Sequence, residues 1–342
     1  MGQSETILLT GGAGYIGSHT YVALVEAGYR VIILDDFSNA KRSVLTRLAQ
    51  LTRVNEVTCY EGSVLDGALL RRVFEENEIA AVVHFAARKA VGESSEKPLA
   101  YFETNCSGLL KLLAAMEAVD VRRLVFSSTA TVYGDPAPEL LPLKEDAPLN
   151  YMSPYAFTKI MSEQMLEQIA ASHASWAFGV LRYFNPVGAH PSGLIGEDPS
   201  DIPNNLMPYI SKVAAGELPH LNVFGNDYDT PDGTGIRDYI HVSDLAAGHV
   251  MSLNRLLATN EGHVVNLGSG QGHSVLEVLA AYGRACGREL PHEIAPRRAG
   301  DVAAYYADAS RAAALLGFET RRSLDDMCAS SWNWIVTGAK EA

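Results

Sequence analysis

A tyrosine and a lysine four residues apart form the first pattern in this sequence that could do chemistry. Tyr155 and Lys159 stand in Pro154–Ser172, whose apolar spacing predicts a helix, and residues at i and i+4 share one helical face. A tyrosine with the ordinary pKa of about 10 is a poor base at neutral pH, but a nearby ammonium group would favour the phenolate. The pair is therefore a candidate acid–base site, although the same spacing on an amphipathic helix is more often packing plus a solvated lysine.

A second pattern is the hydroxyl-rich end of an apolar run. Ser127, Ser128 and Thr129 follow Leu124–Phe126, a run that is typical of a buried strand. Ligands of open α/β folds bind at the carboxyl edge of the sheet, so these hydroxyls are placed where a substrate would lie. Thr129 could hydrogen-bond both the phenolate of Tyr155 and a substrate hydroxyl.

A glycine-rich turn near the N-terminus predicts a dinucleotide site. Gly11 and Gly14 fall between the apolar run Thr6–Thr10 and the helical pattern Tyr15–Ala27, and Gly17 lies in the first turn of that pattern. Glycine permits a positive φ, and its missing Cβ lets backbone N–H groups approach a pyrophosphate at a helix N-terminus. A tight strand–helix turn also uses glycine, but the position at the start of a βαβ unit strengthens the prediction.

The next apolar run ends in two carboxylates, Asp35 and Asp36. A carboxylate about 20 residues beyond the glycines accepts hydrogen bonds from the adenosine ribose and repels a 2′-phosphate. The alternative is a solvated strand end. Beside the glycine turn the pattern favours a binding site, and it favours NAD over NADP.

Short β-branched runs alternate with longer helical patterns in the first half of the chain. This alternation predicts βαβ units around a doubly wound parallel sheet, an α/β fold. We expect residues 1–185 to form the NAD-binding domain, to which the chain returns around 236–270, and residues 186–342 to form mainly a substrate lobe. The expected strands are Thr6–Thr10, Tyr29–Leu34, Ala81–Phe85, Arg123–Ser127 and Ala177–Tyr183, and the expected helices are Tyr15–Ala27, Leu99–Ala118 and Pro154–Ser172.

Composition excludes several classes of protein. The 342 residues carry 27 basic and 40 acidic side chains, and the net charge of −13 argues against nucleic-acid or anionic-membrane partners. The four cysteines form no CxxC pair, so we expect no metal site and no disulfide framework, and a cytoplasmic location fits. No apolar run reaches the ~20 residues of a membrane span, and we expect no signal peptide.

In their order along the chain, these motifs resemble the extended short-chain dehydrogenase/reductase superfamily and, more narrowly, the UDP-galactose (UDP-glucose) 4-epimerase family. The resemblance runs nearly end to end and implies a Rossmann-type sheet with a smaller α/β substrate-binding lobe. In the first half it rests on Thr10–Ser18, His84–Ser94, Phe126–Gly134 and Ser153–Lys159. The segments of the second half, which are more specific to 4-epimerases, are Leu181–Pro191, Pro203–Pro208, Gly233–Val242 and Ala295–Asp301.

The resemblance implies a redox-neutral cycle with tightly bound NAD. Tyr155 would take the proton of the sugar 4-hydroxyl while the C4 hydride passes to NAD, and the 4-keto sugar would rotate before the hydride returns. Lys159 would hold the nicotinamide ribose, and Thr129 would position the 4-oxygen. Besides Tyr155 and Lys159, the implied NAD contacts are Gly11, Gly14, Tyr15, Ile16, Gly17, Asp35, Asp36, Ser63, Val64, Phe85, Ala86, Lys89 and Phe184.

The resemblance also implies a UDP-sugar site and a homodimer joined through the helices expected at Leu99–Ala118 and Pro154–Ser172. Arg237 and Arg298 could pair with the diphosphate despite the overall negative charge, because arginine binds phosphate bidentately. Tyr305 stands where relatives that accept N-acetylated sugars tend to carry a smaller residue, which implies a preference for UDP-glucose and UDP-galactose. The implied substrate contacts are Thr129, Tyr183, Asn185, Asn204, Asn205, Leu206, Asn222, Val223, Phe224, Arg237, Arg298, Asp301 and Tyr305.

Departures and alternatives remain. Ser63 and Val64 stand where relatives usually have Asp-Ile or Asp-Val, and Thr104 replaces a frequent asparagine. A dehydratase or decarboxylase of the same superfamily is the nearest alternative, but the 4,6-dehydratases carry an Asp-Glu pair where this chain has Ala130 and Thr131. An NAD-sensing regulator without catalysis and an alcohol dehydrogenase that exchanges free NAD are the others.

Overall fold

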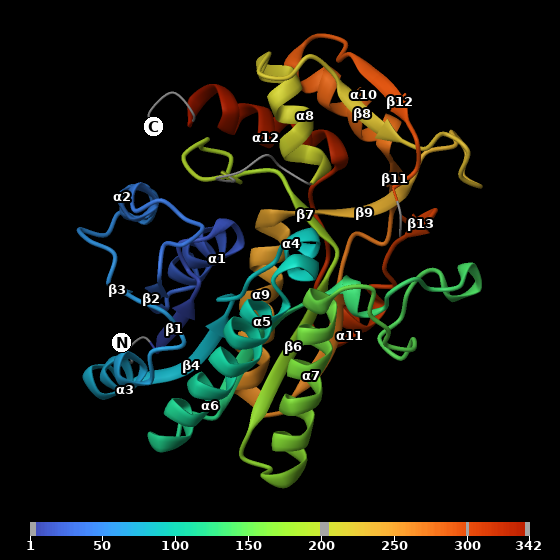
Figure 1. The fold of residues 1–342 in the computed structure, drawn as a ribbon. Coiled ribbons are helices and arrows are strands. Elements are labelled where there is room, and N and C mark those ends of the chain that lie inside the picture. The colour runs from blue at the N-terminus through green and yellow to red at the C-terminus, as the bar shows by residue number, and fades with distance from the viewer. Residues whose placement is uncertain (1–4, 199–204, 299–300, 339–342) are drawn as a thin grey trace. The chain divides into compact units, whose positions relative to one another are not determined.

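The computed structural model describes residues 5–198, 205–298 and 301–338 (Figure 1). The chain divides into two compact units. The first contains the residues up to Gly134, then Asp146–Tyr183 and Ala246–Val265; the second contains Asp135–Glu145, Phe184–Leu245 and the residues from Asn266 onward. The sequence-based division places residues 135–145 in the first domain, whereas in the structure these residues pack with the second unit. The reason is local, since Leu143 exchanges backbone hydrogen bonds with Tyr306 and Asp308.

The first unit is built on a sheet of seven strands in the order β10-β6-β5-β4-β1-β2-β3. Every neighbouring pair from β3 to β6 is parallel. This is the strand order of doubly wound dinucleotide-binding folds, which open a ligand crevice at the carboxyl ends of β1 and β4. The predicted fold class is confirmed. The strands are β1 (Thr6–Thr10), β2 (Arg30–Asp35), β3 (Cys59–Glu61), β4 (Ile79–His84), β5 (Arg123–Thr129), β6 (Ala177–Tyr183) and β10 (His263–Leu267), whose last two residues belong to the second unit.

Helices connect these strands, and one of them differs from the expectation. The helix expected at Leu99–Ala118 is divided into α5 (Pro98–Tyr101), the π-helical turn η1 (Phe102–Ser107) and α6 (Gly108–Ala118). In η1 the Asn105 side chain bonds both backbone groups of Arg88 and the hydroxyl of Thr158. The other helices of this unit are α1 (Tyr15–Glu26), α2 (Ser43–Thr52), α3 (Gly67–Glu76), α4 (Val91–Glu96), the 3₁₀ turn η2 (Ala130–Val132), α7 (Pro154–Ser172) and the greater part of α9 (Val242–Thr259).

The core of the first unit lies between the sheet and these helices. Leu8, Ile32 and Val82 on neighbouring strands are completely buried and pack in one cluster with Leu70 of α3 and Leu109 of α6. Continuous burial of apolar strands is what a sheet covered on both faces requires. Among the described residues, no helix is long and apolar enough to cross a membrane.

The second unit is an α/β arrangement centred on β9 (Ile236–His241). This strand pairs with β11 (Gly272–Ser274) antiparallel, and with β13 (Ala304–Tyr305) and β7 (Asn185–Val187) parallel. A separate parallel pair is formed by β8 (Leu221–Phe224) and β12 (His292–Ala295). The helices α10 (Val275–Cys286) and α12 (Leu324–Thr337) each begin with a capping box. In each box the side chain of a serine accepts the backbone N–H of the acidic residue three positions later, whose carboxylate accepts the backbone N–H of the serine. The helices are η3 (Pro138–Leu140), α8 (Leu206–Ala215), α10 (Val275–Cys286), α11 (Ser310–Leu316) and α12 (Leu324–Thr337).

Candidate active site

The start of α7 fixes the position of the tyrosine–lysine pair. The Ser153 hydroxyl accepts the Ala156 N–H at 3.2 Å, and Pro154 occupies the first helical position, two features that define where a helix begins. Tyr155 therefore lies in the first turn and Lys159 one turn later. The Lys159 Nζ is buried; it donates to the Ser127 carbonyl at 2.6 Å and lies 4.8 Å from the centre of the Phe126 ring.

Burial perturbs both groups. It raises the pKa of Tyr155 to about 12, against the opposing effect of a hydrogen bond with Thr129. It lowers the pKa of Lys159 to about 8, while Cys106 and Glu163 act in the other direction. The chain's own residues thus keep Tyr155 protonated at neutral pH. A cation held beside the phenol would be needed to bring its pKa toward neutrality.

The hydroxyls at the end of β5 differ in what they contact. The Ser127 hydroxyl is hydrogen-bonded to the Tyr183 hydroxyl on β6, and the Ser128 hydroxyl donates to Glu163 on α7. Thr129 accepts the Thr131 N–H at 3.2 Å and also bonds Tyr155. Of the three, Thr129 is the one beside the candidate base. The predicted catalytic residues Tyr155, Lys159 and Thr129 are therefore brought together.

Each glycine of the turn after β1 has a separate physical reason. Gly11 has φ +70°, and a Cβ there would lie 2.7 Å from the backbone nitrogen of Ala86. A Cβ at Gly17 would lie 2.3 Å from the Gly11 carbonyl oxygen, so α1 packs against the turn at a distance that only glycine allows. At Gly14, which precedes α1, a Cβ would meet only the Gly11 oxygen at 3.4 Å. The first N–H groups of a helix have no helical acceptor, so this end of α1 fits a pyrophosphate.

Asp35 faces the same turn, whereas Asp36 does not. The two Asp35 carboxylate oxygens accept the Ala13 and Phe37 N–H groups, each at 2.9 Å. Burial raises the pKa of Asp35, and these two bonds oppose the rise. A carboxylate has about four acceptor positions, so two remain for a ribose diol. Asp36 is exposed, and its carboxylate accepts the N–H and the hydroxyl of Ser38, two residues further along the chain.

The remaining predicted NAD residues lie along the same sheet edge, with one exception. Phe85 follows β4, donates its N–H to the Thr10 carbonyl at 2.9 Å and packs its ring 4.7 Å from that of His249. Val64 lies in the hydrophobic core cluster, so only its backbone is free to meet a ligand. Phe184 belongs to the second unit. Tyr15, Ile16, Ser63 and Ala86 are half-buried, and Lys89 is exposed.

In the second unit, the predicted diphosphate residues fall into two clusters. Arg237 on β9 donates to the Val302 carbonyl at 2.8 Å and to Asp301 at 3.3 Å. Tyr305 on β13 is the direct neighbour of Arg237 in strand register, and its ring lies 5.7 Å from that of Phe184. In the other cluster, the Arg298 guanidinium lies 3.9 Å from the centre of the Phe224 ring.

The other predicted substrate residues occupy varied positions. Asn185 donates its side-chain amide to the Asp238 carbonyl at 2.8 Å. Val223 is completely buried in the core, which leaves only its backbone for a ligand. Asn205 is exposed at the start of α8, Leu206 and Asn222 are half-buried, and Asn204 lies outside the described residues.

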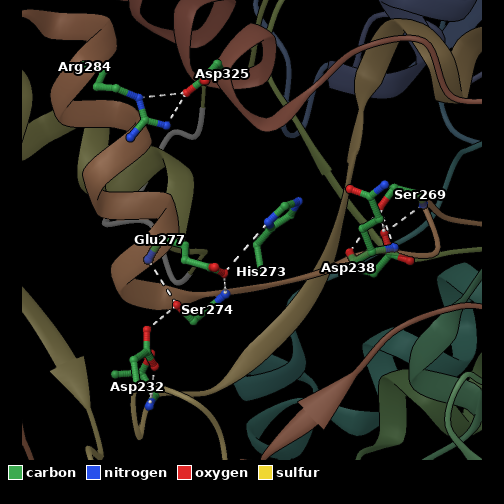
Figure 2. Close-up of polar contacts among 10 residues, drawn as sticks. Asp232, Asp238, Ser269, His273, Ser274, Glu277, Arg284 and Asp325 are labelled. Atoms are coloured by element: carbon green, nitrogen blue, oxygen red, sulfur yellow. Dashed lines mark hydrogen bonds and ion pairs between the residues drawn. The ribbon is translucent and has the colours of Figure 1, made fainter.

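Sequence reasoning missed Asp238, the buried neighbour of Arg237. Its carboxylate accepts the Ser269 N–H and hydroxyl, the Gly270 N–H and the Ala307 N–H, at 2.6 to 3.1 Å (Figure 2). Burial raises its pKa, while the bonds from Ser269, Ala307 and Gly270 oppose the rise. The carboxylate thus joins β9 to the chain after β10 and after β13, and so holds the strand that carries Arg237. An Arg-Asp dipeptide gives no sequence signal for such a role.

The same region contains a second carboxylate that orders the backbone. Asp232 accepts the Thr234 N–H at 2.9 Å and also the hydroxyl of Ser274, the residue that caps α10 (Figure 2). This bond fixes the segment before β9 to the start of α10.

Known proteins resemble this chain over nearly its whole length. The profile of the NAD dependent epimerase/dehydratase family matches residues 7–268. A UDP-glucose 4-epimerase of Bacillus subtilis is 52% identical over 98% of this chain and 99% of its own length. One of Yersinia pestis is 53% identical over 96% of each chain.

Solved structures of known proteins are also similar to this chain over nearly its whole length. A UDP-glucose-4-epimerase of Stenotrophomonas maltophila, with bound NAD and formylated UDP-arabinopyranose, has a TM-score of 0.96 and 47% identity over 99% of this chain and 100% of its own. A UDP-glucose 4-epimerase of Bifidobacterium longum, in complex with NAD+ and UDP, has a TM-score of 0.92 and 49% identity over 98% of this chain and 100% of its own.

Proposed function

Because the chain belongs to the NAD dependent epimerase/dehydratase family, we propose that it is an isomerase that interconverts UDP-galactose and UDP-glucose. The observation that carries the proposal is the hydrogen bond between Tyr155 and Thr129 at the end of β5, the same strand end at which the buried ammonium of Lys159 binds the Ser127 carbonyl. This arrangement offers a proton acceptor and an oxygen-binding hydroxyl at the carboxyl edge of the sheet, where a dinucleotide also binds.

The acid–base work belongs to Tyr155. Its phenol oxygen takes the proton of the sugar 4-hydroxyl in the first half of the cycle and returns it in the second. Thr129 holds the 4-oxygen, and Lys159 holds the nicotinamide ribose and contributes positive charge. NAD held at this edge of the sheet would supply the reversible hydride acceptor that the oxidation and reduction at C4 require. The cycle has no net redox change, so the cofactor would not have to leave the enzyme between turnovers.

The dehydratase alternative needs an acid and a base directly after Thr129. This chain has Ala130, which is buried and apolar, and Thr131, whose N–H and hydroxyl both bond Thr129. Neither side chain titrates near neutral pH, so neither can transfer the proton that elimination of water requires. Ala130 and Thr131 at this turn therefore favour epimerisation over dehydration.

We further propose that the second unit binds the UDP-sugar through Arg237 and Arg298. Arg237 is already oriented by two carbonyls and by Asp301, so little side-chain entropy is lost when it meets a phosphate. Arg298 is held over the Phe224 ring by a cation–π contact, which no carboxylate shares among the interactions of the described residues. Tyr305, buried beside Arg237, would limit the space for a substituent on the sugar.

A homodimer in the cytoplasm is part of the same proposal. Leu99 on α5 is 82% exposed and Leu110 on α6 is 49% exposed, and these are the helices expected to join two copies. Covering such side chains in a second chain would remove apolar surface from water. All four cysteines are free, which suits a reducing compartment.

The test uses pure protein, UDP-galactose and no added NAD. Formation of UDP-glucose is expected, because the cofactor is retained and regenerated. No product, or turnover only with added NAD, would contradict the proposal, and a 4-keto-6-deoxy product would identify a dehydratase. Tyr155→Phe, prepared in the same way, is the matched control for activity from a contaminant.

A further inference from the structure

A buried ion pair lies behind the candidate active site and has no role in the proposed chemistry. Glu163 follows Lys159 by one turn on α7, and Arg182 lies on β6. The Arg182 Nη2 is 2.6 Å from Glu163 Oε2, its Nε is 3.1 Å from both carboxylate oxygens, and the two side chains are only 6% and 7% exposed. Burying two charges costs desolvation that their attraction scarcely offsets. Stability alone is therefore a weak reason for this pair.

The pair is joined to the end of strand β5. The Ser128 hydroxyl donates to Glu163, and Arg182 lies directly across from Ser128 in the register of β5 and β6. Arg182 also donates to the Tyr133 hydroxyl at 3.1 Å. Glu163 thus connects three elements, α7, β5 and β6, at one point.

The last three residues of β5 each contact α7. The Ser127 carbonyl accepts the Lys159 Nζ, the Ser128 hydroxyl donates to Glu163, and Thr129 bonds Tyr155. The first and third contacts involve groups that act on the cofactor or the substrate. The middle contact involves neither, yet it lies between them in sequence on the strand. This contact can therefore fix the position and the rotation of α7 relative to the end of β5.

We propose that Glu163, held by Arg182, is a positioning residue that fixes α7 against Ser128 and so sets the placement of Tyr155 relative to Thr129. The proposal rests on the proposed acid–base role of Tyr155. A misplacement of about 1 Å at a reacting group can cost about 100-fold in rate, so a distant anchor of this kind has a measurable effect.

The charge of Glu163 has a second effect, on Lys159. The titratable groups that interact with Lys159 are Cys106 on η1, His84 on β4 and Glu163 on its own helix. Burial raises the pKa of Cys106 and lowers that of His84 to about 3, so both are neutral near pH 7. Glu163 is therefore the charged group that opposes the effect of burial on Lys159. Without it, Lys159 would lose its proton at a lower pH.

Two variants and one control test the proposal. Glu163→Gln keeps the shape of the side chain and removes the charge, whereas Ser128→Ala removes only the link to β5. Glu167→Gln, one turn further along α7 and exposed, is the matched control. The measurements are kcat and KM for UDP-galactose, the pH profile of kcat, and circular dichroism of the NAD-loaded enzyme.

For Glu163→Gln we expect kcat to fall about 10- to 100-fold with KM within about twofold, and the basic limb of the pH profile to move about one unit lower. For Ser128→Ala we expect a severalfold fall in kcat and an unmoved basic limb. The control should match the wild type. A merely structural pair would change stability but neither the pH profile nor kcat of the folded enzyme.

The proposal is overturned if folded Glu163→Gln keeps kcat within about twofold, if its basic limb does not move, or if the control moves the limb equally. If Glu163→Gln does not fold, Ser128→Ala decides, and an unchanged kcat then overturns the proposal. A wild-type enzyme without epimerase activity would instead contradict the proposed function.

Discussion

The glycines around the start of α1 allow packing and cofactor binding to be separated by two alanine substitutions. At Gly17 an added Cβ would lie 2.3 Å from the Gly11 oxygen and 2.8 Å from the Gly12 Cα, and both neighbours are backbone atoms. The helix would have to move by about 1 Å to restore ordinary contact, and overpacking of this kind costs about 1–3 kcal/mol. Alanine recovers about 1 kcal/mol of helix propensity, so Gly17→Ala should destabilise the protein by a net amount of up to about 2 kcal/mol.

At Gly14 the balance is different. The added Cβ would meet one atom at 3.4 Å, an ordinary contact, and φ is −70°, which alanine adopts without strain. We expect only a small net change in the free energy of unfolding for Gly14→Ala, because the stabilisation of about 0.4–1 kcal/mol from a stiffer unfolded chain is opposed by the poorer N-cap that alanine makes at this position. The methyl group would nevertheless lie where backbone N–H groups must approach the pyrophosphate, so bound NAD should fall sharply.

The assay combines urea unfolding of each variant with quantification of the NAD released from the purified, denatured protein. Because bound NAD itself stabilises the folded state, the free energies of unfolding are compared after the cofactor has been removed. Gly14→Ala with a full complement of NAD would refute the placement of the pyrophosphate. Gly17→Ala that is more stable than the wild type would refute the packing argument.

Three further predictions concern the chemistry. Tyr155→Phe should lower kcat by about 10²–10⁴-fold while bound NAD, measured after denaturation, is retained; near-normal turnover would refute its role. Lys159 has a pKa of about 8, so kcat should fall as the pH rises through about 8 and the ammonium is lost, and a rate that is flat from pH 7 to 10 would contradict this assignment. Tyr305 should exclude an acetamide group, so kcat/KM measured for UDP-glucose should exceed that for UDP-N-acetylglucosamine, and comparable values would overturn the steric argument.

The sequence predicts five strands of the first unit well because nearly all of their residues are buried, whereas β3, which has no buried residue, was not expected. The expected strands Thr6–Thr10 and Ala177–Tyr183 coincide with β1 and β6, and the expected helix Pro154–Ser172 coincides with α7. A continuous apolar run of this length is stable only where both faces of a strand are covered. Ser153-Pro154 indicates a helix start because serine caps a helix N-terminus and proline is favoured at the first helical position. The π-turn inside Leu99–Ala118 was missed because its cause is tertiary: Asn105 bonds Arg88 and Thr158, which lie far away in sequence.

The limits of sequence reasoning are clearest at charged residues. A glutamate on an amphipathic helix is by default solvated, so nothing in the spacing of Glu163 indicates that Arg182 covers it. Asp238 is hidden for the same reason, since its partners Ser269 and Ala307 come from distant segments. The glycine turn and the tyrosine–lysine pair were found because their chemistry depends on neighbours only a few residues away.

Tyr155 itself shows why composition alone misjudges an acid–base site. The phenol is a plausible base by its type and spacing, yet burial raises its pKa to about 12. Each unit of that pKa corresponds to about 1.4 kcal/mol, so several kcal/mol of favourable interaction are required before the phenolate forms near pH 7. Lys159 supplies positive charge only while it stays protonated, which Glu163 favours and burial opposes. The base is therefore active only when a cation lies beside it, and the tyrosine keeps its proton otherwise.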